Sequence, residues 1–74
     1  MNTHPTAQNL NIIIGGVYSF VNKVNYVTIL KVSRVTDKSV YVFSLLDSGT
    51  FSTKEHREGI TNFKKYTYQP NFKL

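Results

Sequence analysis

β-branched and aromatic residues are densest between residues 26 and 46, where two such runs flank the short polar turn 36–39. Asp37 in that turn tolerates tight backbone angles and can bond its own backbone two residues on. The flanking residue types suit a pleated, half-buried surface. The pattern therefore predicts a β-hairpin at the centre of the fold.

Apolar side chains fall on both faces of this predicted hairpin, because successive residues of a strand point to opposite sides. In the first run, one face carries Leu30 and Val32 and the other carries Val27 and Ile29. In the second run, one face carries Val40 and Val42, and the other carries Tyr41, Phe43 and Leu45. A strand with one wet face would alternate apolar and polar residues. We therefore expect cover on both faces, from a closed barrel, a helix or a partner chain.

The segment before the hairpin predicts one strand and a lead-in. Residues 1–9 are polar and aperiodic, and we expect a flexible leader. Residues 10–14 are either a short edge strand or a packed approach to the first full strand. Gly15 and Gly16 predict a turn, residues 17–21 a strand, and residues 22–25 a hairpin loop.

The segment after the hairpin predicts a turn at 47–50, a short strand at 51–53 and a last strand at 64–68, ended by Pro70. Ser52 and Glu55 have the spacing of a capping box at a helix start. We expect one or two helical turns, around 54–57 or around 60–63. Residues 71–74 are expected to form a tail, which leaves 10–70 as a single domain.

Five short strands with a helical turn before the last one resemble the Src-homology-3-type small barrel, over residues 16–68. Tudor, chromo-like and ribosomal-type barrels share this plan. The resemblance implies a mainly all-β fold with a five-stranded, curled antiparallel sheet or barrel. No functional residues of such a family match this chain. The oligonucleotide-binding fold is the main alternative. The chain also resembles, in style alone, small proteins of phages and other mobile elements.

Composition narrows the class of protein further. With 74 residues the chain forms one domain. The core of so small a domain gives only marginal stability unless cross-links or assembly add to it. The absence of cysteine excludes disulfides and a four-cysteine zinc site, and it fits a cytoplasmic location. The longest aliphatic run, 12–14, is too short to cross a bilayer. No secretory signal is recognisable at the N-terminus.

Candidate chemistry is sparse. His56 lies among Glu55, Arg57 and Glu58, a spacing that suits a solvated turn better than a metal site. No serine lies in a G-x-S-x-G motif. The sequence therefore predicts no catalytic site, no metal site, no cofactor and no small-molecule substrate.

The net charge of +5 makes polyanions plausible partners. Cations interleaved with aromatics suit single-stranded nucleic acid, because charge holds phosphates and rings stack on bases. The residues expected to bind nucleic acid or another partner are Lys31, Arg34, Lys54, Arg57, Lys64, Lys65, Tyr66 and Tyr68.

The apolar hairpin faces favour a different function, which is our leading hypothesis. It is a non-catalytic protein-interaction, adaptor or inhibitor-type domain that occupies a partner's surface. A homodimer through an edge strand at residues 10–14 is one form of it. Binding of single-stranded nucleic acid is the alternative.

Overall fold

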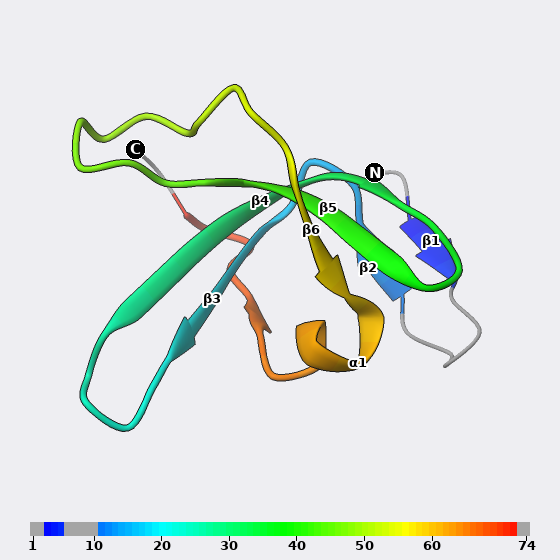
Figure 1. Ribbon diagram of the computed structural model, residues 1–74, viewed down its shortest axis with the longest axis horizontal. Coiled ribbons are helices and arrows are strands. Elements are labelled where there is room, and N and C mark those ends of the chain that lie inside the picture. Colours follow the sequence, from blue (N-terminus) through cyan, green and yellow to red (C-terminus); the bar gives the residue numbers. More distant parts are fainter. Residues whose placement is uncertain (1–2, 6–10, 73–74) are drawn as a thin grey trace.

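The computed structural model describes residues 3–5 and 11–72 and contains two antiparallel sheets (Figure 1). The small sheet pairs β1 with β2. The large sheet has the strand order β6-β5-β4-β3-β7, and α1 lies between β6 and β7 in the chain. The elements are β1 Thr3–Pro5, β2 Asn11–Ile13, β3 Val17–Val21, β4 Val27–Val35, β5 Ser39–Ser44, β6 His56–Gly59, α1 Ile60–Phe63 and β7 Thr67–Tyr68.

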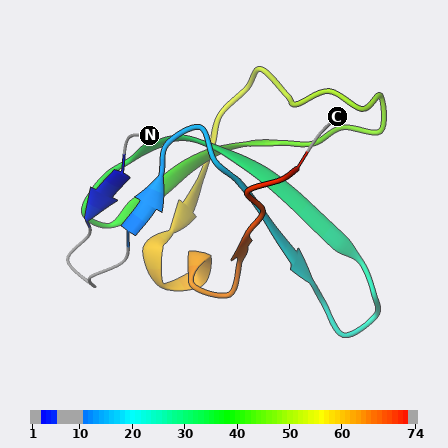
Figure 2. The same ribbon diagram turned by 180° about the vertical axis from the view of Figure 1, so that it is seen from behind.

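This architecture confirms the mainly β fold with a five-stranded antiparallel sheet and one helical turn before the last strand. Closure into a barrel is not found, because β6 and β7 form the two edges of the sheet and do not pair. These edge strands have only four and two residues. In both views the helical turn lies at the end of β6, and the chain then turns back into β7 (Figures 1 and 2). The sheet is therefore open and not strongly curled.

The central β4–β5 hairpin contains an irregularity that the alternating pattern did not predict. Its register shifts between Val32 and Arg34, so that Ser33 is an extra residue, a β-bulge. Strict alternation would place Arg34 on the same face as Val32. Because of the bulge, Arg34 instead lies opposite Tyr41, whose side chain points away from the buried side.

The core lies on one face of the large sheet. Leu30 and Val32 of β4 and Val40 and Val42 of β5 are almost completely buried there. They belong to one cluster that also contains Ile12, Tyr18, Val35, Ile60 and Phe63. A four-residue helix has no stability of its own. The burial of Ile60 and Phe63 therefore holds α1 against the sheet.

The opposite face, here called the outer face, has no comparable cover among the described residues. Ile29, Phe43 and Leu45 are half-buried on it, and Val21 and Val27 are exposed. Phe51 gives only partial shelter, through its bridge to Leu45. In the part of the chain described, neither a closed barrel nor a helix covers this face, and cover by a partner chain stays a prediction.

The N-terminal segment, where a flexible leader is expected at 1–9, contains the short strand β1. Within it, Thr3–Pro5 pairs with Asn11–Ile13 of the same chain, so this strand finds a partner without a second copy. The rest of the leader, at 1–2 and 6–9, lies outside the described residues, as do Leu10 and positions 73–74.

The glycine turn that follows was predicted and is tightly packed. A Cβ on Gly16 would lie 2.9 Å from the Ile13 carbonyl oxygen and 3.1 Å from the Tyr68 ring.

The expected helix at 54–57 is not present, whereas the one at 60–63 is. The hydroxyl of Ser52 accepts a hydrogen bond from the Lys54 amide at 3.1 Å, but no helix follows. The carboxylate of Glu55 is engaged by β4 instead, and the next four residues pair with β5 as β6. The last strand is also shorter than expected, because the chain forms a turn at 64–65.

Candidate functional site

Five exposed apolar side chains gather at one end of the large sheet. Val21 and Val27 are partners across β3 and β4, while Val24 and Tyr26 lie in the turn that joins these strands. Leu46 follows β5, and together these five residues are here called the hairpin surface. Their exposed fractions are 53%, 50%, 80%, 67% and 49%, respectively. The turn that joins β3 to β4 projects from the body of the molecule (Figure 1).

Hydrogen bonds within the turn hold the hairpin surface in shape. The side-chain oxygen of Asn22 accepts from the amides of Val24 and Tyr26, both at 2.9 Å. Asn25 has a φ of 63°, a conformation that asparagine tolerates better than most residues. Val24 and Tyr26 are therefore presented by an ordered turn despite their exposure.

A shallow hollow of about 320 Å³ lies beside this turn. Tyr26, Val27 and Ile29 form one side, and Leu45 and Leu46 form the other. The two sides are joined by a hydrogen bond from the Leu45 amide to the Ile29 carbonyl, at 3.0 Å. The hollow can therefore receive an apolar side chain, with Asp47 at its rim.

A second, different surface lies toward the other end of the outer face. Arg34 of β4 and Arg57 of β6 are both paired with Tyr41 of β5, so a tyrosine lies between two arginines across three strands. The next cross-strand pair on this face joins Lys31 to Phe43, two residues beyond Tyr41 on β5. Cross-strand partners share a face. Lys31, Arg34, Tyr41, Phe43 and Arg57 are here called the cationic face.

Aromatic rings contact the cations of this face. The Arg34 guanidinium lies 3.8 Å from the centre of the Tyr41 ring, well within the range of cation–π attraction. The Lys31 ammonium lies 5.9 Å from the centre of the Phe51 ring. The face therefore combines positive charge with flat apolar surface.

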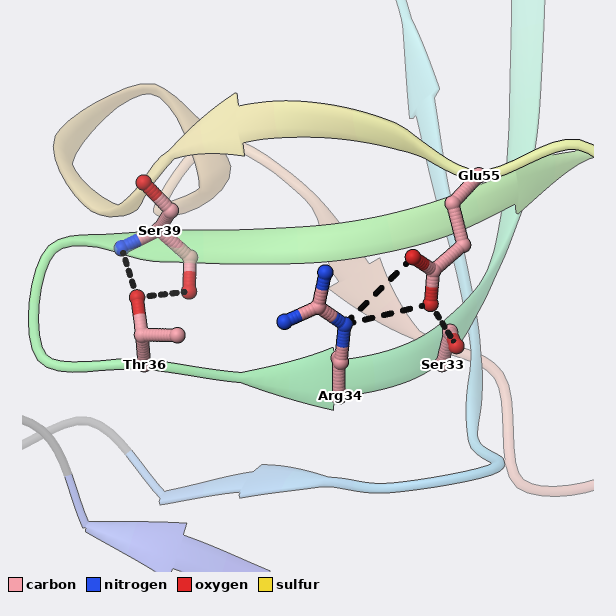
Figure 3. Close-up of polar contacts among 5 residues, drawn as sticks. All are labelled: Ser33, Arg34, Thr36, Ser39 and Glu55. Atoms are coloured by element: carbon pink, nitrogen blue, oxygen red, sulfur yellow. Dashed lines mark hydrogen bonds and ion pairs between the residues drawn. The ribbon is translucent and has the colours of Figure 1, made fainter.

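One acid borders the cationic face. The Glu55 carboxylate accepts a hydrogen bond from the Ser33 hydroxyl and lies 3.4 Å from the Arg34 Nε atom (Figure 3). The bond from Ser33, followed by the charge of Arg34, holds the pKa of Glu55 below its usual value. Glu55 therefore fixes the bulge and orients Arg34, and it offsets one positive charge.

The structure divides the eight predicted binding residues into separate groups. Lys31, Arg34 and Arg57 share the cationic face, and Lys54 is exposed in the turn that precedes β6. The remaining four are Lys64, Lys65, Tyr66 and Tyr68, which follow α1.

The second group belongs to the side of the sheet that α1 covers. The Lys65 ammonium lies 4.7 Å from the centre of the Phe20 ring and 5.9 Å from that of Tyr66. Tyr66 also stacks on Phe63, and burial raises its pKa. Tyr68 contacts Tyr18 of the core. The two tyrosines expected to stack on a ligand are thus occupied mainly in packing.

Sequence reasoning missed Tyr41 and all five residues of the hairpin surface as binding residues. A signal for the hairpin surface was present, because Val24 and Tyr26 are large apolar residues in an otherwise polar turn. Tyr41 gave no signal by itself, since its two arginine neighbours come from other strands.

Among residues 3–5 and 11–72, no three histidine, cysteine or acidic side chains lie close enough to hold a metal ion. His56 does approach Glu58, at 3.6 Å. The same residues contain no helix that is long and apolar enough to span a bilayer. Comparisons with family models, curated proteins and solved structures gave no match to this chain.

Proposed function

We propose that this chain is a non-catalytic protein-interaction module that pairs with a second copy of itself through the hairpin surface. The observation that carries the proposal is the gathering of Val21, Val24, Tyr26, Val27 and Leu46 at one end of the sheet. Such a patch is on the order of 500 Å², near the upper limit of what a monomer exposes. It would form the apolar centre of a small interface.

The distribution of charge favours a second copy as the occupant. The chain carries a net charge of +5, so two copies repel one another over most of their surface. The hairpin surface is bordered by one cation, Lys23, and one acid, Asp47. In a two-fold pair each lysine can face the aspartate of the other copy.

The cationic faces would remain apart in such a pair. Arg34 lies seven positions after Val27 along β4, which is roughly 20 Å at the rise of a strand. Assembly also suits a chain of 74 residues whose core is small. The edges of the large sheet offer little for pairing, because β6 and β7 are short.

Light scattering over a concentration series up to about 0.5 mM tests this proposal. The mass should rise from that of one 8.5 kDa chain toward twice that value. The double change Val24→Ser with Tyr26→Ser should keep the protein monomeric. The matched control is Ile14→Ser, an exposed apolar residue outside the hairpin surface, which should leave the association unchanged. A wild-type chain that stays monomeric throughout refutes the proposal.

A further inference from the structure

We infer that the cationic face is a binding site for single-stranded nucleic acid, centred on Tyr41. Arg34 and Arg57 flank this tyrosine on the two neighbouring strands, and Lys31 lies one step along β4 on the same face. This inference is independent of self-association, because its centre, Tyr41 with Arg34 and Arg57, shares no residue with the hairpin surface and lies toward the other end of the strands.

The arrangement matches the two parts of a single-stranded ligand. Lys31, Arg34 and Arg57 are exposed, so three cations are available to phosphate groups that follow one another along a strand. The negative charge of Glu55 cancels one of these positive charges, and the exposed Lys54 next to it adds one positive charge. The net charge of this region is therefore positive.

Base stacking is the second part of the recognition. The Arg34 guanidinium lies 3.8 Å from the centre of the Tyr41 ring, so two groups on which bases can stack lie in contact. Nucleic-acid bases stack on tyrosine rings and on guanidinium planes alike. Phe43 lies two residues from Tyr41 on the same strand and face, so a second ring is within reach of a neighbouring base.

The same geometry argues against a duplex. A duplex keeps the faces of its bases stacked inside, where Tyr41 and Phe43 cannot reach them. An acidic protein segment would pair with the cations but would gain little from the Tyr41 ring and the Arg34 guanidinium that contacts it. Unpaired bases are the ligand that uses both features of the surface.

Fluorescence anisotropy with labelled twelve-nucleotide oligo(dT) and oligo(rU) tests the inference, with the duplex of the same length and heparin as comparisons. Three phosphate contacts predict that raising salt from 50 to 200 mM weakens single-strand binding about 20-fold. Comparing the two oligonucleotides shows whether DNA or RNA is preferred. Absence of binding to either at 50 mM salt overturns the inference.

A matched pair of double variants locates the site. Lys31→Ala with Arg57→Ala and Lys64→Ala with Lys65→Ala each remove two positive charges from the same chain. The first pair lies on the cationic face, and the second follows α1. We expect the first to weaken oligonucleotide binding at least fivefold more than the second. Equal losses would mean diffuse attraction without a site.

Changes at Tyr41 test the stacking. Tyr41→Leu should weaken single-strand binding about tenfold and leave heparin binding unchanged, whereas Tyr41→Phe should retain binding. If Tyr41→Leu binds like wild type, the inference fails. Circular dichroism confirms that each variant is folded, and the charge variants decide the question if Tyr41→Leu is not.

The two proposals fail separately. The variant with serine at positions 24 and 26 should lose self-association but still bind oligonucleotide with its cationic face. If it loses both activities while remaining folded, the assignment of nucleic-acid binding to the distant cationic face is wrong.

Discussion

Phe63 packs the helical turn α1 against the sheet, and replacing it tests how much this contact stabilises the protein. The residue is 3% exposed, and its ring lies 4.9 Å from that of Tyr18 and 5.2 Å from that of Tyr66. Besides Phe63, only Ile60 is buried among the four residues of α1. Phe63→Ala therefore removes most of the contact between α1 and the sheet.

The expected loss is large relative to the stability of the whole chain. A buried phenylalanine changed to alanine costs about 3–5 kcal/mol. At roughly 0.05–0.15 kcal/mol per residue, 74 residues are stabilised by about 4–11 kcal/mol in total. The variant should thus retain at most a marginal fold. Phe63→Leu fills most of the space but loses two ring contacts, and we expect a loss of about 1–2 kcal/mol.

Urea unfolding followed by far-ultraviolet circular dichroism measures these differences. With a slope near 1 kcal/mol per molar urea, a loss of 3 kcal/mol moves the midpoint by about 3 M. Thr61→Ala, an exposed change in the same turn, is the control and should stay within about 0.5 kcal/mol of wild type. If Phe63→Ala unfolds within 1 kcal/mol of wild type, α1 does not cover the core as described.

Four further changes probe two glycines and two titrating groups. Gly16→Ala should destabilise the protein by about 1–3 kcal/mol in the same urea assay, because the new Cβ would meet backbone 2.9 Å away. Gly59→Ala, with open space around the new methyl group, should be neutral or stabilising. The pKa of Glu55 is lowered by its bond from Ser33, so its contribution is complete above its ordinary pKa and is lost as pH falls below it. Glu55→Gln should flatten the acid limb of a melting-temperature profile, and an unchanged limb would contradict this. Burial raises the pKa of Tyr18 above its ordinary value of 10.0, so stability should fall as pH rises past about 10. Tyr18→Phe should make that alkaline fall shallower, and an equally steep fall would refute the assignment.

Much of the fold follows from patterns that are local in the sequence. The alternation through residues 27–32 and 40–45 correctly separates the two faces of the central hairpin. The three-residue spacing of Ile60 and Phe63 marks the helical turn. These features were predictable because each depends on neighbours within a few positions.

The features that were not predicted depend on contacts between distant segments. The capping pattern at Ser52 and Glu55 is a valid local signal, but Glu55 bonds to Ser33, 22 residues away, and the chain extends as a strand instead. Likewise, the open sheet depends on the lengths of its two edge strands. Local propensity indicated strands there but did not determine how far they pair.

The candidate site shows the same division. Sequence reasoning correctly noted cations and rings in the last third of the chain, but grouped them by position in the sequence. The sheet brings Lys31, Arg34 and Arg57 together from two strands and leaves Lys65 on the side of α1. The central residue, Tyr41, is placed between the arginines only by strand register.

The bulge at Ser33 decides on which side of the molecule Arg34 lies. If Ser33 were paired in a regular ladder, Arg34 would share the buried face of Val32, Val40 and Val42, and its guanidinium would have to leave water. The separation of the buried core face from the cationic face thus depends on a one-residue irregularity of the main chain. A shuffled sequence with identical amino-acid content would not reproduce it.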